Sequence, residues 1–391
     1  MIRTATLASR QLLIGVAGGF AISNFIINVA PQAISGLMDS HGFSEVQAGI
    51  VNSGEIGAIG VSCMALSSML NRLDRGRVVA IGVGLLLICN LLAGSVAGFA
   101  AVAALRIVAG LGAGLVLAVA GAALVAAADP DRLYAQAALG ITLVMTAVIY
   151  VVAGLKQSFG YAGLMAAFAA LVLVCAIPAI RILPRAHAEI PREHAGLGGV
   201  WGAGLLGVIA MLLFSILEGG IWNFAERAAL RAGLDGDQIG RLLAASMFSG
   251  VVGAAVPVLF GHRMGREWPI LLGTALIGCC GWFTYAPPSS LHLVIGIAFF
   301  NLGYFLVIPF LFGGCAELDA TGRLAATVAG VQVLGGALGP VFAGLVIDGF
   351  GYTALANASL LLAALTGLCG TGMALAVRRT RRALLMAEVR S

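Results

Sequence analysis

The sequence predicts an all-α polytopic membrane protein with twelve transmembrane helices. Hydrophobic residues make up 60% of the 391-residue chain and charged residues only 10%, whereas a water-soluble domain carries about 25% charged residues. The mean hydropathy is +1.04. Apolar stretches of about 20 residues, long enough to cross the hydrocarbon layer of a bilayer, recur along the chain. Two of them, residues 78–99 and 355–377, contain no Asp, Glu, Lys or Arg.

Hydropathy places the predicted spans at residues 11–34, 46–69, 78–98, 100–127, 134–155, 161–180, 200–224, 239–260, 268–286, 291–315, 324–347 and 354–377. The first apolar run lacks a small-residue cleavage site and is longer than a signal-peptide core, so we interpret it as a retained span. The longest polar interruption, residues 181–199, separates six spans from six. We therefore expect an N-terminal half at 1–180, a cytoplasmic linker at 181–199 and a C-terminal half at 200–391 with a short basic tail.

The distribution of basic residues predicts the orientation of the chain. An isoelectric point near 9.0 would indicate a nucleic-acid partner in a soluble protein, but here 17 of the 22 basic residues fall in turns on one side of the membrane. Four fall on the other side, and Arg106 lies within a span. Loops rich in Arg and Lys stay in the cytoplasm, so we expect both termini there and no nucleic-acid partner. The excess of arginine over the single lysine, Lys156, indicates GC-rich coding and a bacterial inner membrane.

Two turns that lie six spans apart carry similar basic signatures. Residues 71–77 read NRLDRGR, and residues 261–266 read GHRMGR. On these residues the chain resembles the major facilitator superfamily (MFS), which places a D-R-x-G-R-type signature in the two equivalent turns. Asn71 and His262 stand in the acidic position of the signature. The resemblance implies a cytoplasmic gate formed by Arg72, Asp74, Arg75, His262, Arg263 and Arg266. Basic turns that only enforce topology would explain the arginines but not their repetition.

The resemblance covers nearly the whole chain and implies two six-helix bundles that face each other across a central cavity. In the fourth span, Arg106 and Gly110 match the R-x-x-x-G signature of the family. Transport by alternating access, in which one bundle rocks against the other, is the expected mechanism. The sequence contains no Walker loop, nucleophile elbow, zinc spacing or haem motif. We therefore expect a monomeric transporter rather than an enzyme, with no cofactor and no metal.

Two ionisable residues inside predicted spans are the main candidates for function. Asn52, Glu55 and Ser62 lie on one face of the second span. Arg106 enters the fourth span, where an unpaired arginine costs at least about 2.5–3.5 kcal/mol. Glu55 and Arg106 can form an ion pair, or protonation of Glu55 can change the charge of the cavity. A static structural pair, or an arginine that extends to the interface, is the alternative.

A second acidic residue, Glu218, shares a face of the seventh span with Ser215 and Trp222. These residues fit either a central cavity or an interfacial aromatic belt with Glu218 near water. Hydrogen bonding between helices is an alternative role for the polar residues of other spans. The remaining candidates for the cavity lining are Asn24, Asn28, Thr142, Thr146, Tyr150, Asn301, Tyr304 and Gln332.

Glycines spaced four residues apart predict close helix packing at Gly110 and in the eleventh span. There Gly335, Gly339 and Pro340 resemble the glycine-proline signature that antiporters of the superfamily carry in their fifth span. The fifth span of this chain, residues 134–155, contains no proline, so antiport is not implied. We expect Pro340 to bend a gating helix.

These features predict a secondary active transporter of a small organic solute. Protons would drive it through Glu55, with Arg106 as a modulator. The second hypothesis is a proton-independent facilitator in which Arg106 binds an organic anion. The third is a membrane sensor or scaffold with a transporter fold, although the sequence leaves no soluble domain through which to signal.

Overall fold

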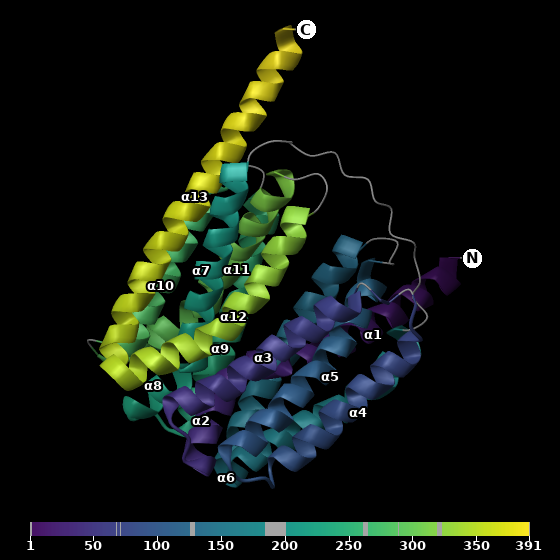
Figure 1. The fold of residues 1–391 in the computed structure, drawn as a ribbon, viewed down its shortest axis with the longest axis vertical. Coiled ribbons are helices and arrows are strands. Elements are labelled where there is room, and N and C mark those ends of the chain that lie inside the picture. Colours follow the sequence, from purple (N-terminus) through teal and green to yellow (C-terminus); the bar gives the residue numbers. More distant parts are fainter. Residues whose placement is uncertain are drawn as a thin grey trace. The chain divides into compact units, whose positions relative to one another are not determined.

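The computed structural model describes residues 2–67, 69–70, 72–125, 130–183, 201–260, 265–287, 289–318 and 323–390, and every regular element of this part is helical (Figure 1). The helices are α1 (Ile2–Asn28), α2 (Ala30–His41), α3 (Glu45–Ser67), α4 (Arg75–Ala93), α5 (Phe99–Val125), α6 (Pro130–Ile182), α7 (Trp201–Asn223), α8 (Ala225–Arg231), α9 (Gly236–Phe260), α10 (Glu267–Tyr285), α11 (Ser290–Leu318), α12 (Arg323–Phe350) and α13 (Tyr352–Arg390). Eleven helical stretches in these ranges are long and apolar enough to cross a membrane.

One of these stretches contains two predicted spans. Leu139–Ile182 is 44 residues long, and the backbone inside it turns at Gly160, where φ is 61° and ψ is −149°. This left-handed φ favours glycine. The Ser40 hydroxyl accepts a hydrogen bond from the Tyr161 backbone N–H at 3.0 Å and fixes the turn. The predicted spans 134–155 and 161–180 therefore lie on either side of Gly160, and the prediction of a twelve-helix membrane protein is confirmed.

The first span contains a break that hydropathy does not reveal. Residues 11–34 are predicted as one helix, but α1 ends at Asn28 and α2 begins at Ala30. The same break separates α7 from α8 in the other half of the chain. Residues 26–30 read IINVA, and residues 221–225 read IWNFA. The amide of Asn28 donates to the Asn24 carbonyl at 2.9 Å, and the amide of Asn223 donates to the Gly219 carbonyl at 2.7 Å. The two breaks thus share the pattern I-x-N-x-A and the same type of side-chain bond.

The described helices group into two compact units. The first comprises Met1–Pro191 with Ala229–Ala244, and the second comprises Arg192–Ala228 with Ala245–Ser391. In the first unit α5 packs against α3 and α4, and α1 packs against α6. In the second unit α7 packs against α12 and α13, and α10 packs against α11 and α13. Most of the predicted linker, residues 181–199, lies outside the described residues, so its boundaries remain predictions.

Large apolar side chains remain exposed along both units. In the first unit Ile88 is 58% and Val174 is 74% exposed, and in the second Leu361 is 61% and Leu368 is 70% exposed. A soluble protein rarely exposes extended apolar surface. These faces suit contact with lipid.

Candidate functional site

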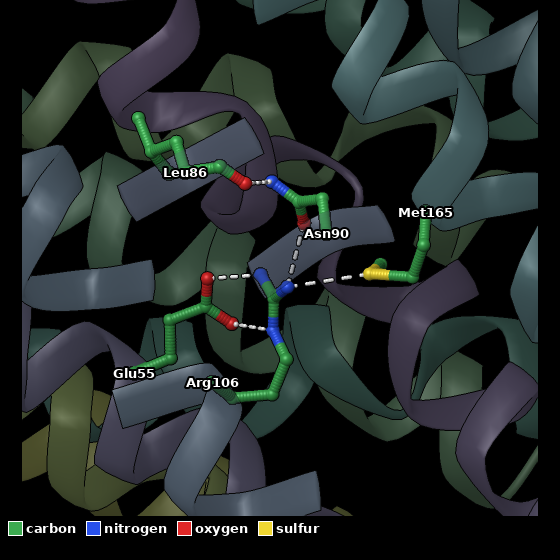
Figure 2. Close-up of polar contacts among 5 residues, drawn as sticks. All are labelled: Glu55, Leu86, Asn90, Arg106 and Met165. Carbon is green, nitrogen blue, oxygen red and sulfur yellow. Dashed lines mark hydrogen bonds and ion pairs between the residues drawn. The ribbon is translucent and has the colours of Figure 1, made fainter. Parts of the chain in front are cut away.

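A buried ion pair joins α3 to α5 in the first unit. The Nε of Arg106 donates to Glu55 Oε2 at 2.8 Å, and its Nη2 donates to Glu55 Oε1 (Figure 2). Both residues are only 1% exposed. The two parallel hydrogen bonds give the bidentate geometry in which arginine binds a carboxylate most strongly. The structure therefore brings together Glu55 and Arg106, the main ionisable candidates that the sequence places inside spans.

Three other side chains surround the guanidinium. Its Nη1 donates to Asn90 Oδ1 at 2.6 Å and to the Met165 sulfur at 3.3 Å (Figure 2). The Asn90 amide in turn donates to the Leu86 carbonyl at 2.7 Å. The guanidinium carbon lies 6.0 Å from the ring centroid of Phe168, which is within the range of a cation–π contact. Every nitrogen of the guanidinium therefore has a partner, and Arg106 does not extend to the interface.

Glycines on α5 allow the pair to form. A Cβ atom added to Gly110, one turn after Arg106, would collide with the backbone oxygen of Glu55 and lie 3.0 Å from the Ala58 Cβ. A Cβ on Gly114 would collide with Ser62 Oγ and the Ile59 carbonyl. Backbone contact between α3 and α5 therefore requires glycine at both positions.

The predicted polar face of α3 is turned into the first unit. Asn52 is 2%, Glu55 1% and Ser62 9% exposed. The Ser62 hydroxyl donates to the Ala58 carbonyl of its own helix at 2.8 Å. The three residues share one buried face, and on it Glu55 pairs with the charge of Arg106 on α5.

Glu218 lies between two aromatic pairs in the second unit. Phe214 on α7 stacks on Tyr304 of α11 with ring centroids 5.8 Å apart, and Trp222 stacks on Phe300 at 5.6 Å. Glu218 is partly buried and forms no hydrogen bond or ion pair with any residue in the described ranges. Trp222 is only 4% exposed. It is therefore a packed residue of the second unit rather than part of an exposed aromatic belt.

The other predicted cavity residues have diverse partners. The Asn301 amide donates to Ser246 Oγ at 3.0 Å, and the Gln332 amide donates to the Tyr304 hydroxyl at 3.3 Å. Asn24, like Asn28, donates to its own helix, at the Phe20 carbonyl. Tyr150 is 47% exposed and donates to Asp237 Oδ1 at 3.0 Å. The structure thus gathers Tyr304, Gln332 and Trp222 around α11 but leaves Asn24 and Asn28 bonded within α1.

The glycines of α12 pack against α7. A Cβ atom on Gly335 would lie 2.6 Å from the Ser215 Cβ, and one on Gly339 would lie 2.7 Å from the Gly219 Cα. Pro340 lies inside α12, with its Cδ 3.6 Å from a Cβ built on Gly219. The predicted close packing is present, and the gating role of this segment remains a prediction.

The sequence profile of the Major Facilitator Superfamily matches residues 13–340. The chain belongs to this superfamily. No protein of curated function matches the chain in sequence. Across the described residues no group of three or more His, Cys, Asp or Glu is placed to hold a metal ion. Superfamily membership makes the protein an integral membrane transporter of small solutes.

Solved structures of superfamily transporters share this fold. The nucleoside transporter NupG is 14% identical with a TM-score of 0.72, and the match covers 95% of this chain and 99% of that one. A bacterial homologue of the human lysosomal transporter Spinster is 13% identical with a TM-score of 0.71, covering 97% and 98%. A structure described as addressing substrate recognition in proton-dependent oligopeptide transporters is 17% identical with a TM-score of 0.72, covering 97% and 100%. At these identities the likeness establishes the fold alone.

The described residues of the two superfamily turns make different contacts. In the first turn Asp74 caps α4 by accepting from the backbone N–H groups of Gly76 at 2.9 Å and Arg77 at 3.2 Å. Its neighbour Arg72 is exposed, whereas Arg75 is only 9% exposed. In the second turn His262 and Arg263 lie outside the described residues. Arg266 donates to both carboxylate oxygens of Glu317, each at 2.7 Å, and so ties the start of α10 to the end of α11.

Several partners of Arg106 and Arg266 carry little or no signal in the sequence. Asn90 carries a signal that could have revealed it, because it is the only Asn, Gln or charged residue within the predicted span 78–98. Met165 and Phe168 carry none, since apolar residues are expected anywhere in a span. Glu317 stands at the end of a span, where an acidic residue is unremarkable.

Proposed function

We propose that this superfamily member is a secondary active transporter of a small organic solute in a bacterial inner membrane, coupled to protons through Glu55. The observation that carries the proposal is the Glu55–Arg106 pair, 1% exposed in the first unit. Burying two charges is costly even when they are paired, and well-packed apolar residues are often as stable or more so. A charged pair at this depth therefore suggests a role beyond packing.

Proton coupling would follow from the geometry of the pair. A proton on Glu55 removes the negative charge that holds the guanidinium and leaves Arg106 with Asn90 and Met165 as partners. The contact between α3 and α5 then loses its main polar bond. If the two conformations of the transport cycle hold this pair differently, they bind the proton with different affinity, and such a difference is what coupling requires. A D-xylose-proton symporter and a proton-dependent oligopeptide transporter are among the structures with this fold, which supports the proposal.

The facilitator hypothesis has less support. It needs Arg106 to bind an anion, but the guanidinium is 1% exposed and its nitrogens already have partners. Uptake by proteoliposomes of a panel of organic acids, neutral solutes and organic cations tests both hypotheses. Proton coupling predicts accumulation above the external concentration only when a pH gradient is imposed. Equilibration without accumulation under every gradient would favour the facilitator.

The charge asymmetry predicts a testable topology with both termini in the cytoplasm. Reporter fusions after Gly199 and after Ala383 should both give a cytoplasmic signal, and a fusion after Asp235 should give a periplasmic one. The reason is that loops rich in arginine remain in the cytoplasm. A periplasmic signal from the Ala383 fusion would require an odd number of spans and contradict the prediction.

The proposed cytoplasmic gate predicts a rate effect at Arg266. Replacing Arg266 by Ala removes both bonds to Glu317, and we expect the initial transport rate to fall several-fold at nearly unchanged expression. The pair is partly exposed, with side-chain exposures of 24% and 39%, so the loss of unfolding free energy should be at most about 1 kcal/mol. Exposed Arg379→Ala serves as a control for the removal of a basic side chain. A normal transport rate in the double variant Arg266→Ala, Arg72→Ala would show that these arginines serve only to set the topology.

A further inference from the structure

One face of α7 alternates aromatic and acidic side chains. Phe214, Glu218 and Trp222 follow one another at intervals of four residues, so they lie in one row on the helix. On α11, Phe300 and Tyr304 have the same spacing, and each stacks on one of the α7 aromatics. The interplanar angles are 21° for Phe214–Tyr304 and 12° for Trp222–Phe300. Glu218 therefore occupies the position between two parallel aromatic stacks.

The described helices that pack against α7 supply no cation for this carboxylate. Helices α10, α11, α12 and α13 pack against α7, and the spans predicted within them contain no Asp, Glu, Lys or Arg. Within those spans the single titratable nitrogen group is His292, which lies at the start of α11 and contacts Ser289 and Phe283. A charged carboxylate inside a membrane span is energetically unfavourable unless a partner or a proton neutralises it. No residue within the described ranges pairs with Glu218, so a proton or a bound cation must neutralise it.

We propose that Glu218 and the flanking aromatic rings bind the substrate, and that the substrate is an organic cation such as a hydrophobic amine or quaternary ammonium. This inference rests on the proposed transport function and adds the substrate class. Aromatic rings attract cations through their negative faces, and the carboxylate provides the opposite charge. Apolar substituents of the cation would pack on the rings. An anionic substrate would be repelled by Glu218.

The adjoining residues fit a binding wall better than a sealed core. Glu218, Tyr304 and Gln332 are all partly buried rather than fully buried, and Gln332 donates to the Tyr304 hydroxyl at 3.3 Å. One turn before Glu218, the Ser215 hydroxyl is buried and has no hydrogen-bond partner among the described residues. The site therefore offers the Glu218 carboxylate, the partly buried Tyr304 ring and polar groups from α7 and α12, while Phe214, Trp222 and Phe300 are at most 4% exposed.

Binding of two isosteric ions to the purified full-length protein tests the inference directly. Tetraphenylphosphonium is a permanent cation, and tetraphenylborate is an anion of the same shape. In detergent, with protein-free micelles subtracted, equilibrium dialysis should detect saturable binding of the cation but not of the anion. Glu218→Gln should weaken cation binding at least tenfold, whereas Glu218→Asp should retain part of the affinity. Asp348→Asn removes an exposed carboxylate of the same unit and should bind as the wild type does.

The binding assay has two outcomes that would contradict a cation site at Glu218. Equal cation binding by the wild type and by Glu218→Gln, or saturable binding of both ions, would overturn the inference. Thermal unfolding of each variant shows whether a loss of binding reflects misfolding, and Tyr304→Leu provides a second variant that should weaken binding without altering charge. The assay involves no gradient, so failure of the transport proposal is separate from it. Cation binding through Glu218 without transport would refute the proposed function alone, and pH-driven uptake of anions without cation binding would refute the inference alone.

Discussion

Replacing Glu55 by glutamine is expected to abolish accumulation driven by a pH gradient while exchange of substrate across the membrane continues. Glutamine keeps the shape of the side chain and an oxygen that can accept from Arg106, but it cannot bind and release a proton. Uptake into proteoliposomes with and without a pH gradient, together with counterflow exchange, measures the two activities. Accumulation at the wild-type level by Glu55→Gln would exclude Glu55 as the coupling residue, and Glu218 would then be tested for that role.

Stability and exchange measurements together distinguish this role from a purely structural one. Removing one partner of a buried pair costs about 3–5 kcal/mol because the other charge remains buried. Glu55→Gln should lose thermal stability in either role, because Arg106 remains buried and charged, whereas exchange should be lost only if Glu55 serves purely as its partner. Replacing Arg106 by Met as well should then recover much of the stability, because no charge is left unpaired. Restored stability with restored transport in the double variant would identify the pair as structural.

A methyl group on Gly110 is expected to destabilise the first unit. In Gly110→Ala the added Cβ would collide with the Glu55 backbone oxygen, and a backbone atom cannot rotate away as a side chain can. Helix α3 must therefore move from α5, which separates Glu55 from Arg106. Overpacking of this kind costs typically about 1–3 kcal/mol, and the lengthened ion pair adds to that. Thermal unfolding in detergent and pH-driven uptake should both fall.

Gly121 on the same helix provides a matched control. A Cβ built there meets no atom within 4 Å, and alanine is the better helix former by up to about 1 kcal/mol. Gly121→Ala should therefore be neutral or slightly stabilising. If Gly110→Ala lowers thermal stability and Gly121→Ala does not, then contact with α3, and not helix propensity, requires glycine at position 110. Equally small changes in thermal stability for both variants would mean that α3 and α5 can move apart without destabilising the first unit.

The sequence was sufficient to predict the fold because the bilayer imposes a simple rule on composition. Twenty apolar residues are needed to span it, and the chain repeats that length throughout. Glu55 and Arg106 could be predicted for the same reason, since a charge stands out in an apolar helix. The geometry of the Glu55–Arg106 pair could not be predicted from the sequence, because it depends on how closely α3 approaches α5 at Gly110. The break between α1 and α2 escaped hydropathy, because Ile26, Ile27, Val29 and Ala30 keep the run apolar on average across Asn28.

The sequence was less informative about residues whose importance comes from their neighbours. Phe168 and Met165 are ordinary apolar residues until the fold places them against a guanidinium. Glu218 was one of several polar candidates in the sequence. Its position between the rings of Tyr304 and Phe300 depends on the register of α7 against α11, which no local pattern in the chain encodes.

The buried ion pair also constrains how the protein is made. Glu55 and Arg106 are 51 residues apart, and a ribosome adds about 5–20 residues per second. The carboxylate therefore leaves the ribosome roughly 3–10 s before its partner. During that interval a charged glutamate at the centre of a lone span costs about 2.5–3.5 kcal/mol in the bilayer. We expect the second span to stay beside the insertion machinery, or to carry a proton, until the fourth span arrives. Release of one helix into lipid would then depend on the synthesis of another, and the first unit would enter the membrane as an assembled group rather than helix by helix.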